Sequence, residues 1–232
     1  MQRLMFTGKL INRCNMSIIE KLKKLLSEVP PKWNQIRNIM DSNTLTKEDL
    51  ATLAISLADD CFCEYTDALD PEIKGLDADN MCSDYLIEGL SLLLEYGLDP
   101  NIVVNEDNVM WNLQWVYAPN VGAGALRLLL ENGGDPNHEQ SSWGGRLFQN
   151  IDYEIDEDVG EVSWYAVIQM WLVLIAYGGY RIEGILPITM KNGNSVEIFK
   201  NFENYYFEKN EVLQIFDKET GEEVAYYGYK TK

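Results

Sequence analysis

Apolar residues recur at helical spacing in the N-terminal part of the chain. Residues 17–27 have apolar side chains at positions 18, 19, 22, 25 and 26, with Ser17 placed as an N-cap and Glu20 at the capping-box position. A pair of prolines ends this segment, and the same spacing returns from Trp33 to Met40. The pattern predicts two helices that form an N-terminal helical cap over residues 16–46.

A ten-residue phrase occurs twice, at positions 92 and 128. Leu92 to Asn101 reads LLLEYGLDPN and Leu128 to Asn137 reads LLLENGGDPN, so eight of the ten positions are identical. A weaker copy, LIAYGG from Leu174 to Gly179, lacks the Asp-Pro-Asn ending. Each phrase is typical of a leucine-rich helix that runs to a left-handed glycine C-cap, and the two full copies then turn through Asp-Pro-Asn. The phrase indicates an internal repeat.

Each repeated helix needs a leading helix to complete a hairpin. Candidates are Lys47 to Tyr65, Val109 to Val116 and a short Arg146 to Asn150. Three hairpins result, and each requires its neighbours to bury its apolar face.

The repeated phrase resembles the outer helix of the ankyrin repeat family, and the resemblance covers residues 47–181. The family's Thr-Pro-Leu-His opening is absent, and Asn108 to Asn112 stands in its place, so the repeats are divergent. The resemblance implies a stack of helical hairpins that binds proteins through its concave face and loop tips, and it rarely implies catalysis.

After Tyr180 the helical period gives way to alternation. Ile185 to Met190 and Ser195 to Phe199 fit one hairpin around Asn192-Gly193, and Val212 to Phe216 with Glu223 to Tyr229 fit a second. The aromatic residues here favour β packing over a ligand platform. We therefore predict a β appendage over residues 182–232.

The remaining composition favours the cytoplasm. Residues 1–15 look like a disordered or non-native extension and lack the uninterrupted apolar run of a signal peptide. The longest apolar stretch, Val167 to Ala176, is too short to span a bilayer and predicts a buried helix. The spacing of the four cysteines suits neither a disulfide framework nor zinc, which favours a reducing compartment.

The net charge of −18 is concentrated in the middle of the chain. Residues 1–47 carry nine Lys and Arg against three Asp and Glu, residues 48–190 carry four against twenty-six, and residues 191–232 carry six against eight. The middle segment, at −22, repels nucleic acid and anionic lipid and attracts basic protein surfaces. The alternative interpretation is that the charge only keeps the protein soluble.

Two insertions carry much of this acid. They span Thr66 to Asn80 and Asp152 to Glu161, and in a stack of parallel hairpins both emerge on the same edge. We expect this edge to contact a partner, together with two tryptophans of the repeat region. One of them, Trp143, lies in a Gly-rich loop. The predicted partner-binding residues are Asp67, Asp70, Glu72, Asp77, Asp79, Trp111, Trp143, Asp152, Glu154, Asp156, Glu157 and Asp158.

Catalytic and ligand-binding chemistry finds little support. The single histidine, His138, follows a turn and is expected to be a solvated loop residue. An EF-hand-like start at Asp77 fails because Met81 and Cys82 occupy the positions of an oxygen ligand and of the sharp-turn glycine. No phosphate-cradling glycine motif is present. We therefore predict no catalytic, cofactor-binding or metal-binding residue.

The function that follows is a non-enzymatic protein-binding module, monomeric when free. Our leading hypothesis is an acidic inhibitor or immunity-type protein that masks a basic partner. An adaptor or structural subunit that docks through its β appendage is the alternative, and a hydrolase with a carboxylate pair is a third reading.

Overall fold

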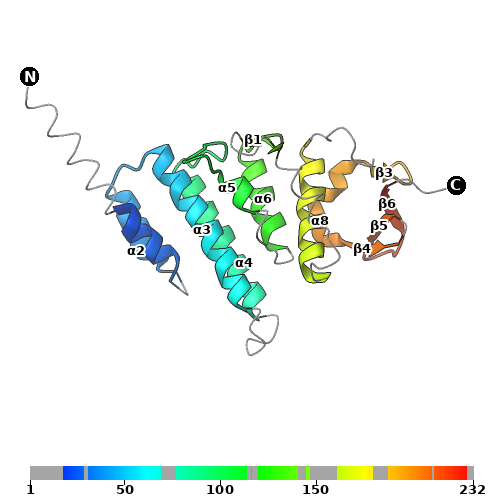
Figure 1. The fold of residues 1–232 in the computed structure, drawn as a ribbon, viewed down its shortest axis with the longest axis horizontal. Coiled ribbons are helices and arrows are strands. Elements are labelled where there is room, and N and C mark those ends of the chain that lie inside the picture. The colour runs from blue at the N-terminus through cyan, green and yellow to red at the C-terminus, as the bar shows by residue number, and fades with distance from the viewer. Residues whose placement is uncertain are drawn as a thin grey trace, which may run out of the picture.

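The computed structural model shows a mainly helical chain with a small antiparallel sheet. The described residues are 18–28, 31–68, 77–113, 116, 120–140, 145–146, 161–179, 188–210 and 212–228. Helices lie side by side through the N-terminal and middle parts, and a four-stranded sheet lies at the C-terminal end (Figure 1). The predicted fold class, mainly α with a small sheet, is confirmed at this level.

The N-terminal pair of helices is present. The first covers residues 18–26 and buries Ile19, Leu22, Leu25 and Leu26, the apolar positions that predicted it. The second is α2 (Trp33–Asp41). The predicted N-cap, Ser17, lies outside the described residues.

Polar contacts join α2 to the end of helix α4 (Asp77–Glu95). Arg37 donates to Glu95 at 2.6 Å, and the hydroxyl of Tyr96 donates to Asp41. These are exposed contacts, so we expect each to contribute little free energy and mainly to fix the angle between the helices.

The helical region forms two rows. One row contains α3 and α5, which pack against each other, and the other contains α4, α6 and α8, with α6 between its two neighbours. Helix α3 also packs against α4 and so joins the rows. The bounds are α3 (Lys47–Ala68), α5 (Val109–Asn112), α6 (Val121–Glu131) and α8 (Glu161–Ala176).

The three predicted leading helices fare differently. Helix α3 confirms the first and runs three residues past Tyr65, starting from a reciprocal capping box between Thr46 and Asp49. Helix α5 has only four residues, so the prediction that it reaches Val116 was too long. The helix predicted from Arg146 was wrong at that residue, because Arg146 belongs to strand β2 (Gly145–Arg146), which pairs with β1 (Glu139–Gln140).

All three copies of the repeated phrase end in the same way. Gly97, Gly133 and Gly178 have φ of +93°, +92° and +84°, which confirms the left-handed cap. In each copy an N–H just after the glycine donates back into the last helical turn. These bonds run from Leu98 to Leu93 at 3.0 Å, from Gly134 to Leu129 at 2.9 Å and from Gly179 to Leu174 at 2.8 Å.

The asparagine that closes each full phrase links it to the following copy. Asn101 donates from Nδ2 to the carbonyl of Gly133 at 2.9 Å and accepts at Oδ1 from the N–H of Asp135 at 2.7 Å. Asn137 donates to the carbonyl of Gly178 at 3.3 Å. An asparagine at the same position of each full phrase thus reaches the turn of the following copy, and the bond of Asn137 is the longer one.

The C-terminal strands form a sheet of order β3-β6-β5-β4. The pairing of β5 with β6 confirms the second predicted hairpin. The first predicted hairpin was wrong, because β3 pairs with β6 and residues 196–204 form a 3-10 helix. The bounds are β3 (Ile188–Met190), η2 (Val196–Asn204), β4 (Tyr205–Lys209), β5 (Leu213–Asp217) and β6 (Glu223–Tyr227).

The sheet shares the core of the helical region. Trp171 on α8 meets the ring of Tyr227 edge-on with centroids 4.5 Å apart, and the hydroxyl of Tyr165 accepts from the N–H of Phe207 at 2.9 Å. Phe199 and Phe202 of η2 are fully buried. Side chains of the sheet and of the helices therefore belong to one continuous hydrophobic cluster.

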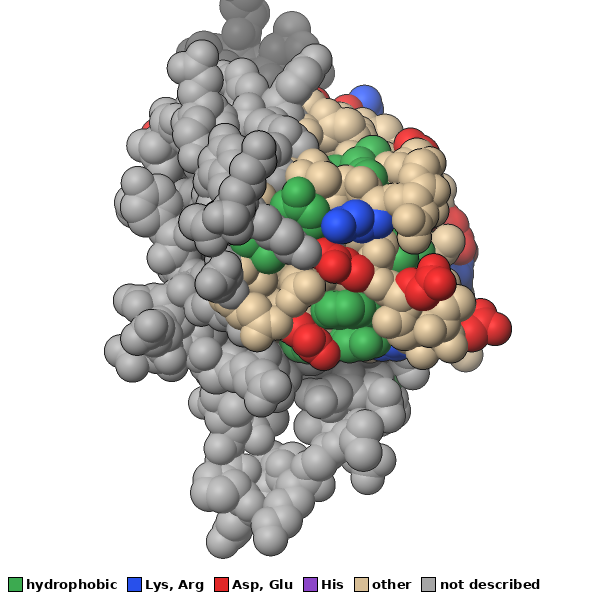
Figure 2. Space-filling model, turned by 90° about the vertical axis from the view of Figure 1, so that its right-hand side faces the viewer, with side chains coloured by type: hydrophobic (Ala, Val, Ile, Leu, Met, Phe, Trp, Pro, Cys, Tyr) green, Lys and Arg blue, Asp and Glu red, His purple; other side chains and the backbone are tan. Residues whose placement is uncertain are grey.

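The C-terminal end of the molecule has a mixed surface. Figure 2 looks onto this end, and on the described part of the face acidic, basic and hydrophobic side chains are interspersed. Within the described ranges, no helix is both long enough and apolar enough to cross a membrane.

Candidate functional site

The chain between α4 and α5 forms a small projection, which we call the finger (residues 102–107). The N–H of Val104 donates to the carbonyl of Asp107 at 2.8 Å, and the N–H of Asp107 donates back at 3.0 Å. Between them Asn105 and Glu106 have φ of 52° and 69°. This is a two-residue hairpin with both central residues left-handed, a turn that matches the twist of its flanking strands.

Asn108 anchors the base of the finger. Its side chain is 1% exposed and donates to the carbonyls of Pro100 at 2.8 Å and Ile102 at 3.0 Å. Its Oδ1 accepts from the N–H of Met110 at 2.8 Å and so caps α5. One buried amide thus fixes both the entry to the finger and the start of the following helix.

Asn112 joins the finger to α3. Its Nδ2 donates to Oδ1 of Asp59 at 2.9 Å and to Oδ2 of Asp107 at 3.1 Å. Carboxylates from two distant parts of the sequence therefore meet on one amide, at the junction of α3, α5 and the finger.

Val103 gives this region its apolar contact surface. It is 45% exposed and is the large hydrophobic residue that stands out into solvent among those the structure describes. Its neighbours Ile102 and Val104 pack against the core. The finger therefore offers an apolar contact beside carboxylates that can accept hydrogen bonds, which is chemistry suited to binding.

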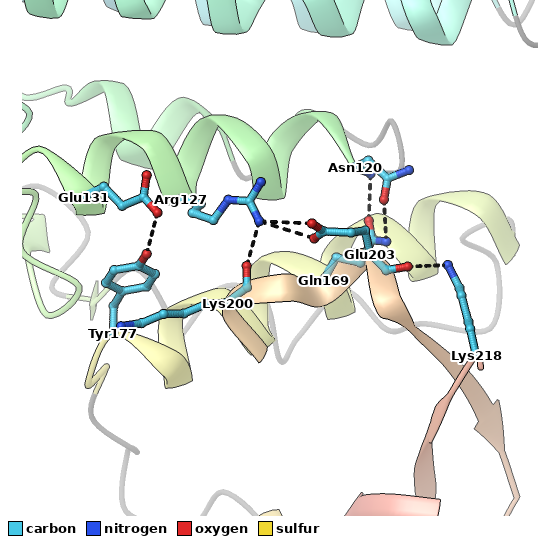
Figure 3. Close-up of polar contacts among 8 residues, drawn as sticks. All are labelled: Asn120, Arg127, Glu131, Gln169, Tyr177, Lys200, Glu203 and Lys218. Carbon is cyan, nitrogen blue, oxygen red and sulfur yellow. Dashed lines mark hydrogen bonds and ion pairs between the residues drawn. The ribbon is translucent and has the colours of Figure 1, made fainter. Parts of the chain in front are cut away.

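A second polar group fixes the helices to the C-terminal region (Figure 3). Arg127 on α6 donates to the carbonyl of Lys200 at 2.7 Å, pairs with Glu203 at 3.3 Å, and lies over the ring of Phe202. Each of its partners belongs to η2, so this arginine holds η2 against α6.

One side chain of α8 and one from the residue that follows it complete this group. Buried Gln169 accepts from the N–H of Asn120 at 2.7 Å and donates to its Oδ1 at 2.9 Å. Tyr177, just after the helix, donates to Glu131 at 2.9 Å, and burial followed by this hydrogen bond raises the pKa of Tyr177 to about 12. The tyrosine thus stays protonated, and the group is structural in every contact it makes.

Only part of the predicted acidic edge falls on described residues. Asp67 lies in α3, and Asp77 and Asp79 lie in α4, so the loop predicted from Thr66 to Asn80 is shorter than expected. Acidic residues are compatible with helices and are favoured in the first turn. The density of acidic residues between Thr66 and Asn80 therefore did not indicate a loop reliably. The predicted residues outside the described part are Asp70, Glu72, Trp143, Asp152, Glu154, Asp156, Glu157 and Asp158.

The structure corrects the expectation for Trp111. Its side chain is 1% exposed, so it belongs to the core and presents no surface to a partner. Trp111 lies on the short helix α5, which packs against α3, and its ring turns into the core of the helical region. Its indole Nε1 is buried and has no hydrogen-bond partner in the described part of the chain.

The surroundings of His138 differ from the solvated loop residue that the sequence predicts. The histidine is half-buried rather than fully solvated, and its Nε2 is enclosed without a hydrogen-bond partner among the described residues. The same described residues contain no group of three or more His, Cys, Asp or Glu side chains able to hold a metal ion.

The finger was missed in the sequence because its signal is short. Val103-Val104-Asn105 places β-branched residues before an asparagine, which is a mild indication of a tight hairpin. The meeting of Asp59 with Asp107 carries no local signal, because the two are 48 positions apart, from 59 to 107.

Comparisons with known proteins identify no relative of this chain. No protein-family model matches the chain, and no curated protein or solved structure shows a significant match.

Proposed function

We propose that the chain is a divergent ankyrin-like repeat protein that binds another protein. The proposal is supported by three copies of one phrase that share the same left-handed glycine cap and the same hydrogen bond into the last helical turn. It is also supported by the bonds of Asn101 and Asn137 to the glycine of the following copy. Regular units joined in register make an extended surface, which suits protein binding better than a closed catalytic cleft.

The partner is a protein with a basic surface, and the chain acts as an inhibitor or immunity-type protein that masks it. The observation that carries this proposal is the charge of the middle of the chain. Between Lys47 and Arg127 the only basic residue is Lys74. A surface of one sign accelerates association with an opposite charge and repels nucleic acid.

Binding without catalysis is the simpler account of the polar residues. The hydrogen bonds of Asn108, Asn112 and Arg127 each hold one element against another. A general base of the histidine type would have to be His138, whose ring nitrogen is enclosed.

The test is a pull-down from the native host with the full chain, eluted by a salt gradient and identified by mass spectrometry. We expect a basic protein to be released at moderate salt, because the attraction between exposed charges is screened. The variant D156N/E157Q/D158N removes three predicted contact charges without changing side-chain size and should release the same protein earlier. Elution of that protein at unchanged salt would remove this insertion from the interface.

The alternative hypothesis, an adaptor that docks through its sheet, predicts binding that does not depend on salt. Docking through the sheet would rely on apolar contact and would resist salt. The mixed surface in Figure 2 offers it little support. Recovery of a salt-resistant assembly would nevertheless favour it over masking of a basic protein.

A further inference from the structure

The conformation of the finger keeps Val103 exposed, because the residues on both sides of it are held against the core. Ile102 and Val104 pack against the core on either side of Val103, and the turn that follows is closed by two backbone hydrogen bonds of 2.8 Å and 3.0 Å. Exposure of 45% therefore belongs to a fixed loop conformation. A loose loop could fold its valine back onto the surface, whereas this one cannot do so without breaking its own hydrogen bonds.

The position of the finger is also fixed in advance. Buried Asn108 bonds to two carbonyls on the way into the finger, and Asn112 ties Asp107 to Asp59 on α3. A partner that binds here meets a surface that is already ordered. Little conformational entropy is then lost in the interface, so even a small contact gives useful affinity.

The negative charge around the finger favours a basic binding partner. Residues 75–126 contain eight Asp and Glu and no Lys or Arg. Asp59, Glu106 and Asp107 lie at the finger or directly beside it. An acidic or phosphate-bearing segment would be repelled, and a purely apolar segment would cover these carboxylates without offering them an opposite charge.

We propose that the finger docks a basic protein segment in which an apolar side chain packs on Val103 and a neighbouring arginine or lysine meets the carboxylates of Glu106 and Asp107. This rests on the proposed function and assigns it a surface. That surface is distinct from the acidic insertions named in the sequence, because the finger connects one hairpin to the next and the insertions lie within hairpins.

The experiment is an amide shift titration of the isotope-labelled full chain with two synthetic peptides at low salt. One peptide alternates arginine with leucine, and the other alternates arginine with glycine. We expect the arginine-leucine peptide to shift the resonances of residues 102–107 and to bind more tightly than the arginine-glycine peptide. Loss of one side-chain contact of this size corresponds to about fivefold in the dissociation constant.

Two variants and a matched control sharpen the result. V103T keeps the branched shape and removes one apolar methyl, and E106Q keeps the side-chain size and removes the charge. Each should weaken the arginine-leucine peptide severalfold. E219Q removes an exposed carboxylate in the turn between β5 and β6 and should leave binding unchanged.

The outcomes separate the two proposals. Shifts that map elsewhere on the acidic segment, or that survive both finger variants, overturn the finger as the docking surface and leave the proposed function standing. If neither peptide binds at low salt, attraction of basic proteins by the acidic segment is itself contradicted.

Discussion

The helical region and the C-terminal sheet are held together by contacts of different range. In the helical region the same short phrase makes the same cap three times, and an asparagine at its end reaches the next copy. The sheet region instead joins the helices through the shared hydrophobic core and through contacts without a repeated pattern, such as Arg127 to η2 and Tyr165 to β4, between segments far apart in sequence. We therefore expect loss of a repeated contact in the helical region to lower the free energy of unfolding by an amount that depends on its geometry. Loss of a contact at the sheet should act mainly on the sheet.

The largest effect is expected at Asn108, which anchors the base of the finger and caps α5. N108A leaves the carbonyls of Pro100 and Ile102 without this donor and removes the cap of α5, and we expect a loss of about 3 kcal/mol in the free energy of unfolding. Urea denaturation followed by circular dichroism measures this. N108D keeps the capping oxygen but turns a buried carboxylate toward the carbonyls of Pro100 and Ile102, so it should destabilise the fold at least as much as N108A.

The two linking asparagines test whether the repeated contact has a graded strength. N101A removes bonds of 2.9 Å and 2.7 Å to the next copy and should cost about 1 to 2 kcal/mol. N137A removes a bond of 3.3 Å to the next copy, longer than either bond of Asn101, and should cost less than N101A. Equal losses by the same denaturation assay would contradict the difference in geometry.

The sequence predicts the local part of this comparison well. The glycine caps, the turns and the helices of Lys47–Ala68 and Val121–Glu131 follow from spacing and from residue types that favour one backbone conformation. What it misses depends on distance. The pairing of β3 with β6 skips 32 intervening residues, from 191 to 222, and the burial of Trp111 depends on core residues from several parts of the chain.

The candidate site shows the same limit. The acidic character of the middle segment can be counted in the sequence. The finger could not be located in this way, because it is defined by Asn108 and Asn112 reaching across to other segments. Asparagine is common in turns, and nothing local indicates that these two are buried.

In the sheet region, Tyr165 offers a contact that can be removed with little change in packing. Y165F deletes the hydroxyl that accepts from the N–H of Phe207 while the ring contact, with centroids 4.8 Å apart, is kept. We expect a loss of about 1 kcal/mol and faster amide exchange in β4 than in α4. Uniformly faster exchange in both elements would show that the sheet and the helices unfold as one unit.

The smallest effect is expected from Asp217, the last residue of β5 before the turn to β6. The backbone N–H of Thr220, its hydroxyl and the N–H of Glu219 hold the pKa of Asp217 below its usual range. A lowered pKa in the folded state means that this carboxylate stabilises the fold above its unfolded pKa, about 3.9, and that the stabilisation is lost as pH falls through the folded value. Melting temperatures of the wild type and D217N should therefore differ at pH 7 and converge in acid.

The most direct test of a charge-driven binding module is an affinity measurement at two salt concentrations. It uses the full chain and the host protein identified in the pull-down. Calorimetry at about 0.05 M and about 0.5 M salt spans the range over which exposed charges are screened. The account predicts that the dissociation constant rises by at least about tenfold at the higher salt. A dissociation constant that stays the same across this range would contradict it, because the acidic middle segment would then contribute nothing to binding.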